Sequence, residues 1–134
     1  MSKLLEIEGI GETYAAKLEA VGIGSVEALL EVCATPKGRE AVAQKADISE
    51  KLILEWANHA DLFRIDGIGS EYADLLEGAG VDTVPELAQR NAANLHEKMK
   101  AINEAKELVR RLPSEKQVES WIEQAKALPR ILTY

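Results

Sequence analysis

The sequence is poor in cysteine and in long hydrophobic runs. Cys33 is the only cysteine among 134 residues, which excludes an internal disulfide, and no His/Cys cluster has the spacing of zinc ligands. Lys, Glu or Asp interrupts every apolar stretch before it could span a bilayer, and the start MSKLLEIEG lacks the apolar run of a signal peptide. We therefore expect a cytoplasmic protein without a membrane segment, in which Cys33 is a small core residue.

Aromatic residues are also scarce, at 4% of the chain. No stretch alternates apolar and polar residues at period two, so β-strands are not expected. Alanine, leucine, glutamate and lysine are abundant, and these residues favour helices. The fold class predicted from composition and pattern is all-α.

Sequence motifs that carry catalysis are missing as well. There is no nucleophile elbow, no Walker-type lysine loop and no metal-ligand motif, and the carboxylates are spread along helices as surface charges. His59 and His96 are isolated from partners at ligand spacing. We expect a protein that is not an enzyme, with no small-molecule substrate and no cofactor.

Charge of one sign dominates, but unevenly. The net charge is −7, with 16 basic and 23 acidic residues. Residues 1–35 carry two lysines against six glutamates, and residues 63–88 carry one arginine against six acids. Residues 89–134 reverse the balance, with nine basic residues against six glutamates. The basic series Lys98 to Arg111 is expected to form a solvated helix face, and it is the best electrostatic candidate for an acidic partner.

A duplicated segment is the most informative feature of the chain. Residues 7–30 and 65–88 align at an offset of 58 with 11 identities in 24 positions, including the turns Gly9-Ile10-Gly11 and Gly67-Ile68-Gly69. Ser49-Glu50-Lys51 with Trp56 reappears near the end of the chain as Ser114-Glu115-Lys116 with Trp121. The sequence predicts one compact domain, 1–134, built of two fused repeats of about 1–62 and 63–134 with pseudo-twofold symmetry.

Capping residues mark the expected helices. A helix over Thr13–Val21 should end at Gly22, and Ser25 should cap the next one. Thr83 with Glu86 has the pattern of a capping box.

Further caps divide the rest of each repeat. Thr35-Pro36 should open a helix through about Ala46, and Ser49 should cap a longer one. A helix between Asn91 and Arg111 should stop before Pro113, and Ser114 should begin the last one.

The glycine turns have the chemistry of an anion site. Each leaves backbone N–H groups without partners at the start of the following helix, where the helix dipole is positive. The segments IEGIGETYAAKLEAVGIGSVEALL and IDGIGSEYADLLEGAGVDTVPELA resemble the helix-hairpin-helix superfamily. Over nearly its whole length the chain is also similar to an uncharacterised prokaryotic family, domain of unknown function 4332. The superfamily resemblance implies sequence-nonspecific binding of double-stranded DNA, sometimes with a monovalent cation on the turn carbonyls.

The resemblance implies a defined set of phosphate-binding residues. They are the amides of the turn glycines, the hydroxyls that follow them and the nearest basic side chains: Gly9, Gly11, Thr13, Lys17, Arg64, Gly67, Gly69 and Ser70. This chain departs from the superfamily pattern, because Glu12 and Ser70-Glu71 stand where DNA-binding members usually have Pro, Lys or Arg. Each such carboxylate repels phosphate instead of releasing a counterion.

An alternative function follows from the acidic flanks. A protein-interaction or scaffold module would keep the fold while its acidic surface does not bind nucleic acid, as a monomer or a weak homodimer. In either case Tyr14, Tyr72, Trp56 and Trp121 lie at core spacing and are expected to pack inside rather than to stack on bases.

Overall fold

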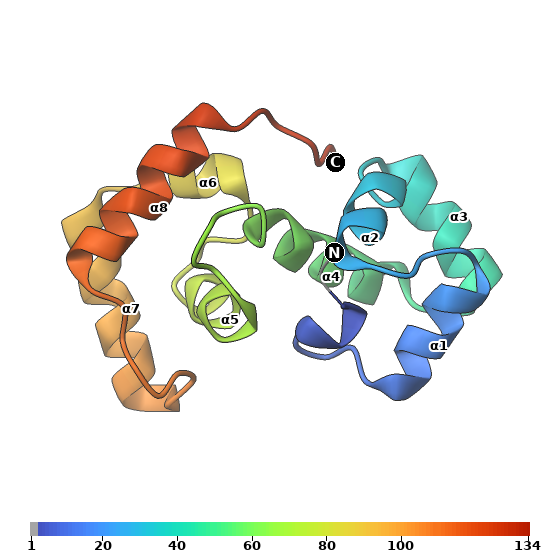
Figure 1. The fold of residues 1–134 in the computed structure, drawn as a ribbon, viewed down its shortest axis with the longest axis horizontal. Helices are drawn as coiled ribbons and strands as arrows, with labels where there is room; N and C mark the ends of the chain where they lie inside the picture. Colours follow the sequence, from blue (N-terminus) through green and yellow to red (C-terminus); the bar gives the residue numbers. More distant parts are fainter. Residues whose placement is uncertain (1–2) are drawn as a thin grey trace. The chain divides into compact units, whose positions relative to one another are not determined.

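The computed structural model describes residues 3–134, and within that range it is all-helical, with no strand (Figure 1). No helix in this range is both long and apolar enough to cross a membrane. The elements in chain order are η1 (Leu4–Glu6), α1 (Glu12–Ala20), α2 (Val26–Val32), α3 (Pro36–Ala46), α4 (Glu50–Leu62), α5 (Ser70–Gly78), α6 (Val84–Ala88), α7 (Ala92–Lys106) and α8 (Glu115–Ala127).

Most helices begin directly after the capping residues that the sequence predicts. Side-chain oxygens of Ser25, Thr35, Asn91 and Ser114 each accept a hydrogen bond from the backbone N–H three residues later, at 3.0 to 3.1 Å. Ser114 forms a full capping box, since Gln117 accepts the N–H of Ser114 in return. Ser49 likewise accepts the N–H of Leu52 at 3.3 Å. Five predicted helix starts are thereby confirmed, because a side chain satisfies a donor that the helix leaves open.

The capping box predicted at Thr83 is wrong. Its hydroxyl donates to Glu86 Oε1 at 3.4 Å and accepts nothing from the helix backbone. Glu86 Oε2 instead accepts the N–H of Asp82, also at 3.4 Å. At the start of α6 the Glu86 carboxylate therefore accepts hydrogen bonds from the Asp82 N–H and the Thr83 hydroxyl, and Thr83 does not cap the helix.

The helix predicted up to Arg111 is also shorter than expected. It stops at Lys106, because Glu107 adopts a left-handed conformation with φ 50° and ψ 47°. Asn103 then accepts the N–H of Val109 through Oδ1 at 3.0 Å. An asparagine side chain that takes a backbone donor competes with helix continuation, so the turn comes well before Pro113.

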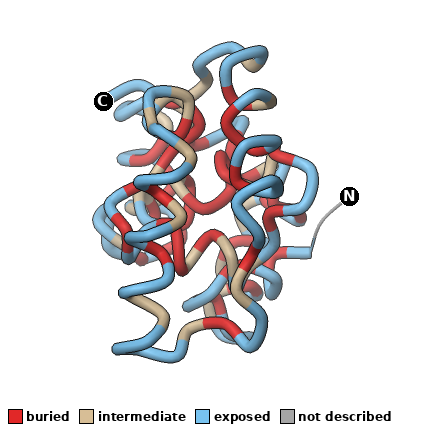
Figure 2. Tube along the Cα trace, turned by 90° about the vertical axis from the view of Figure 1, so that its left-hand side faces the viewer, coloured by how far each residue is buried: buried red, intermediate tan, exposed pale blue. Residues whose placement is uncertain are grey.

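The described chain consists of two compact units. Unit 1 runs through Asp61 and takes in Arg130–Tyr134, whereas unit 2 spans Leu62–Pro129. In unit 1, α1 packs against η1 and α3. The interior is formed by side chains on the inward faces of these elements, and the tube in Figure 2 shows buried and exposed residues alternating along the helices. The largest fully buried residues of unit 1 are Ile7, Leu18, Ile23, Leu29 and Ile53.

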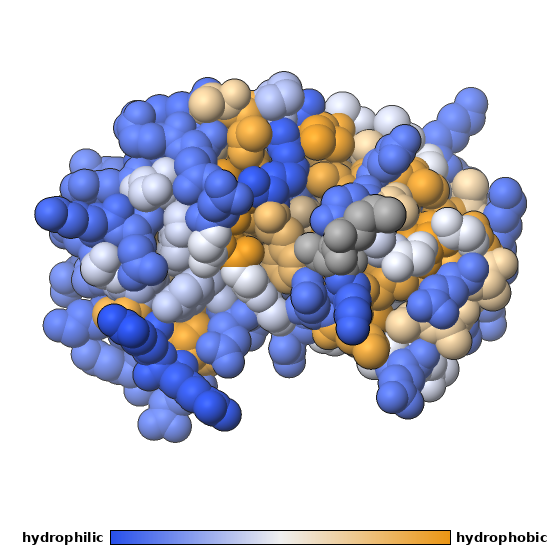
Figure 3. Space-filling view, viewed as in Figure 1, coloured by the Kyte–Doolittle hydropathy of each residue, from blue (hydrophilic) through white to orange (hydrophobic). Residues whose placement is uncertain are grey.

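Unit 2 is organised around α8. This helix packs against both α6 and α7, and α7 also packs against α5. Trp121 and Val118 of α8 lie in the core with Leu76 of α5, Leu87 of α6 and Met99 of α7. In the view of Figure 3, the surface over α7 and α8 is mostly hydrophilic.

A buried arginine holds the last residues of the chain on unit 1. Arg39 is only 6% exposed. Its guanidinium donates to the carbonyls of Cys33, Ala34 and Thr133 at 3.0, 3.2 and 2.7 Å. The Thr133 N–H donates to the Ala34 carbonyl at 2.9 Å, and the Tyr134 ring centre lies 5.7 Å from the guanidinium carbon. Three carbonyl acceptors thus replace the carboxylate that a buried cation usually has.

Cys33 is fully buried, as the composition predicts, and this burial makes stability depend on pH. Burial raises the pKa of its thiol from 9.0 to about 11, and the nearby Arg39 charge partly opposes the shift. Between these values the unfolded chain loses the proton while the folded chain keeps it, so rising pH favours unfolding. The slope is at most about 1.4 kcal/mol per pH unit.

We therefore predict that the urea midpoint falls more steeply between pH 9 and 11 in the natural chain than in Cys33→Ala. Tyrosine and lysine titrate in both proteins and cancel in the comparison. Parallel pH profiles would show that the thiol is not buried in solution.

Candidate nucleic-acid interface at the glycine turns

The two glycine turns have the same backbone conformation at corresponding residues. Gly9 and Gly67 have φ of +92° and +98°, a region that favours glycine. Gly11 and Gly69 are extended, with φ of −88° and −105°, and are the N-caps of α1 and α5. Neither offers a side-chain cap, so the following helices begin without an acceptor of their own.

Matching hydrogen bonds close the two turns. The N–H of Ile10 donates to Ile7 at 3.1 Å, and the N–H of Ile68 donates to Ile65 at 3.2 Å. The side chains of Ile10 and Ile68 are buried, as predicted. A buried isoleucine between two exposed glycines fixes each turn to its unit while leaving the backbone at the surface.

The amides that follow each turn are open. Ala15 and Ala73 are the first residues to donate into their helices, each at 2.9 Å to the N-cap glycine carbonyl. The preceding N–H groups of α1 and α5 form no hydrogen bond within residues 3–134, and both helices are nine residues long. Each helix therefore directs unpaired donors and the positive end of its dipole to solvent.

The predicted hydroxyls lie at these helix starts but at different positions. Thr13 is the second residue of α1 and is exposed, whereas Ser70 is the first residue of α5 and is half-buried. Carboxylates take the alternate places, with Glu12 first in α1 and Glu71 second in α5. Each turn thus combines one hydroxyl with one acid in the first helical turn.

The two predicted basic residues are bound to carbonyl groups. Lys17 donates from Nζ to the carbonyl of Asp47 at 3.2 Å. Arg64 donates to the carbonyl of Pro129 at 2.7 Å. The donors that remain open at the turns are consequently neutral amides and hydroxyls, and a phosphate that recruited either cation would have to compete with these hydrogen bonds.

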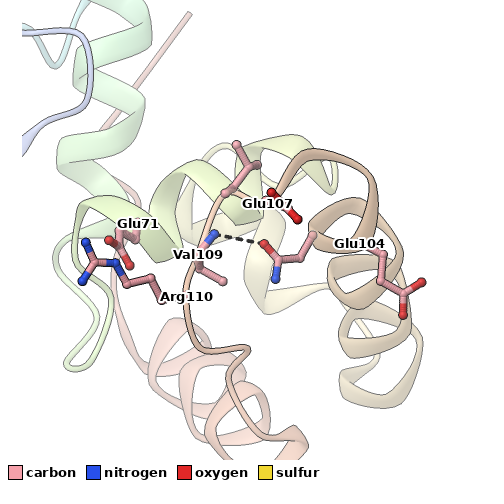
Figure 4. A pocket seen from close by; sticks show the side chains of 7 residues that line it. Glu71, Glu104, Glu107, Val109 and Arg110 are labelled. Carbon is pink, nitrogen blue, oxygen red and sulfur yellow. Dashed lines mark hydrogen bonds between the residues drawn. The ribbon is translucent and has the colours of Figure 1, made fainter.

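A pocket of about 730 Å³ lies beside the start of α5 (Figure 4). Glu71 and Arg110 gather at one end, and Glu104 of α7 lies towards the other. Glu107 adds a third carboxylate. Arg110 therefore brings a cation from the segment after α7 to the surroundings of the second turn, which the linear sequence does not reveal.

Basic side chains also reach Gly80, which follows α5 in unit 2. Arg90 donates to the carbonyl of Gly80 at 3.0 Å. A Cβ placed on Gly80 would lie 3.7 Å from Lys98 Nζ. The corresponding Gly22 of unit 1 has nothing within 4 Å of the same position, although both glycines have φ near +90°. The surroundings of unit 2 are thus more basic than its local sequence suggests.

An aromatic pair lies under each turn. Tyr14 and Trp56 have ring centres 5.0 Å apart, and Tyr72 and Trp121 have ring centres 5.3 Å apart. Both tryptophans are 2% exposed, so the core placement expected from their spacing is confirmed. A Cβ on Gly9 would lie 3.5 Å from Trp56 Nε1, and one on Gly67 would lie 3.0 Å from Trp121 Nε1.

The turn carbonyls are partly engaged. Ile7 and Gly11 each accept one backbone hydrogen bond in the first turn, and Ile65 and Gly69 do so in the second. The monovalent cation implied by the superfamily resemblance stays a prediction.

These contacts predict a graded cost of adding a side chain to the turns. Gly9→Ala forces alanine into a positive φ, which costs about 1–2 kcal/mol of folding free energy. Gly67→Ala adds a tight contact with Trp121 and should cost more. Gly24→Ala is the control, because nothing lies within 4 Å of its Cβ position and its φ is not in the positive region. Urea unfolding followed by tryptophan fluorescence measures all three. Equal stability of Gly67→Ala and Gly24→Ala would contradict the turn geometry.

Comparisons with known proteins give one assignment. The model of the family described as "Domain of unknown function (DUF4332)" matches residues 8–128. Searches of the curated proteins and of the solved structures find no match. The matched segment includes both turns and all eight α-helices. The chain therefore belongs to the DUF4332 family.

Proposed function

We propose that the chain binds the phosphate backbone of double-stranded DNA without reading its sequence, using the two glycine turns as neutral donor sites. The observation that carries the proposal is the matching pair of exposed turns, each followed by a nine-residue helix with open amides. Oxygen acceptors of a phosphodiester satisfy such amides, and the helix dipole favours their charge. Both turns resemble the helix-hairpin-helix pattern, whose turn amides contact phosphates.

The electrostatics predict weak binding. Glu12 and Glu71 repel phosphate from the helix starts, and Lys17 and Arg64 are bound to carbonyls. Non-specific complexes of this kind have dissociation constants of roughly 10⁻⁴ to 10⁻⁶ M at physiological salt. We expect this chain at the weak end of that range and at higher affinity in low salt.

A capping carboxylate provides a direct test. Gly11→Asp and Gly69→Asp would place an acceptor on the open amides and a negative charge where phosphate binds, while preserving an extended N-cap conformation that aspartate adopts readily. We predict unchanged or slightly raised folding stability and at least tenfold weaker binding of a labelled duplex in fluorescence anisotropy. The double variant should bind least.

Gly24→Asp is the matched control. It adds the same charge at an exposed position, and Asp82 already occupies the corresponding place in unit 2. Its binding should stay within about twofold of the natural chain. No binding of any duplex at low salt, or equal loss in the control, would overturn the proposal.

The salt dependence distinguishes the turns from the basic series Lys98 to Arg111, which does not form the single helix face expected, because α7 ends at Lys106 and Arg110 and Arg111 follow it. Three cations lie beside the turns, Lys17, Arg64 and Arg110, so the slope of log affinity against log salt should be no steeper than about −2.7. A slope of about −4.5 would require some five ion pairs and would assign binding to Lys98, Lys100, Lys106, Arg110 and Arg111.

A protein-interaction role is the second candidate, and a hollow in unit 1 favours it. The hollow has a volume of about 470 Å³ and is lined by Leu30, Ala34 and Ile131 together with Glu27 and Glu31. A mainly apolar lining that includes two carboxylates fits an apolar side chain flanked by basic residues on a partner protein. Ile131→Lys should leave DNA binding unchanged and remove such an interaction.

A further inference from the structure

The tryptophan beneath each turn has a donor without a partner. Neither indole N–H, of Trp56 or of Trp121, forms a hydrogen bond within residues 3–134, although both residues are 98% buried. A buried indole N–H usually finds an acceptor, and leaving one unsatisfied costs roughly 1–3 kcal/mol. The acceptor is missing at corresponding positions in both units, which requires a physical explanation.

Each indole nitrogen is close to its turn and is not fully shielded from solvent. Trp56 Nε1 lies 3.5 Å from the Cβ position of Gly9, and Trp121 Nε1 lies 3.0 Å from that of Gly67. Neither nitrogen is among the fully inaccessible side-chain atoms without partners in the described chain. Since both glycines are exposed, the side of the turn that lacks a side chain is where an acceptor reaches the indole.

Glycine serves two purposes at these positions. Its positive φ shapes the turn, and its missing Cβ leaves the indole N–H uncovered. An alanine at Gly67 would place a methyl group 3.0 Å from the nitrogen and cover it.

We infer that Trp56 and Trp121 are ligand-binding residues, whose indole N–H groups donate to a phosphate oxygen held at the same turn as the open amides of α1 and α5. This inference rests on the proposed function and adds the tryptophans to its donor set. The donors are all N–H or O–H groups without charge, which suits an anionic oxygen. They also explain how a turn flanked by glutamates, whose predicted cations Lys17 and Arg64 are bound to carbonyls, could hold phosphate.

Phenylalanine variants remove the donor and retain most of the ring. We predict that Trp56→Phe and Trp121→Phe each weaken binding of a labelled duplex about tenfold, the effect of one hydrogen bond to a charged acceptor. Tyr14→Phe is the matched control, since it alters the same aromatic pair without touching the indole, and it should bind like the natural chain. Thermal unfolding of every variant checks that the fold is retained.

Each phenylalanine variant keeps one tryptophan as a built-in probe. In Trp56→Phe the emission comes from Trp121, and it should shift when duplex saturates the second turn. Inorganic phosphate alone should produce a smaller change, because it can occupy each turn only as a single ion.

The outcomes separate the two proposals. If the natural chain binds duplex and both phenylalanine variants bind equally well, the tryptophan inference is overturned while the proposed function stands. If the natural chain binds no duplex, the proposed function fails and the inference fails with it. Should a phenylalanine variant not fold, the indole Nε1–H resonances of the natural chain decide: a downfield shift on adding duplex supports the inference, and unchanged resonances overturn it.

Discussion

The close approach of a turn glycine to a buried indole is the constraint on which the candidate site depends. Trp56 comes from α4 and Trp121 from α8, so a core residue of a later helix supports each turn. The indole is fixed by its aromatic partner, Tyr14 or Tyr72. A glycine with positive φ is the residue that can pass over the ring without strain or overlap. The open amides that follow are held in place by this contact.

The chemistry of the turns is set by which donors are already used. Lys17 and Arg64 are bound to backbone carbonyls, and the first turns of α1 and α5 carry glutamates. What remains is neutral: amides, hydroxyls and the indole N–H groups. Neutral donors gain little from counterion release, so affinity would come from geometry and would fall only gently with salt. This distinguishes the turns from the basic series Lys98 to Arg111.

The features that depend on residue type and short-range spacing could be predicted from the sequence. The all-helical fold, the caps at Ser25 and Ser114 and the inward isoleucines of both turns follow from residue type and spacing. The end of α7 did not follow, because it depends on Asn103 accepting the N–H of Val109 rather than on Pro113. No pattern of hydrophobicity signals that competition between a side chain and the helix backbone.

Contacts between residues far apart in the chain could not be predicted from the sequence. Arg39 looks like a surface residue of α3, yet it is buried because it gathers carbonyls that include one 94 positions away, at Thr133. Tryptophan spacing predicted burial but could not reveal that the indole nitrogens face Gly9 and Gly67. Arg110 likewise reaches the surroundings of the second turn only through the fold. The tryptophans and Arg110 therefore belong to the candidate site only through the fold.

A crystal structure of the full chain with a short duplex tests the central claim most directly. The account predicts phosphate oxygens within hydrogen-bonding distance of the amides that follow Gly11 and Gly69, with the indole nitrogens of Trp56 and Trp121 donating to phosphates at the same turns. A complex in which the duplex lies along the basic series Lys98 to Arg111, with both turns facing solvent, would contradict it.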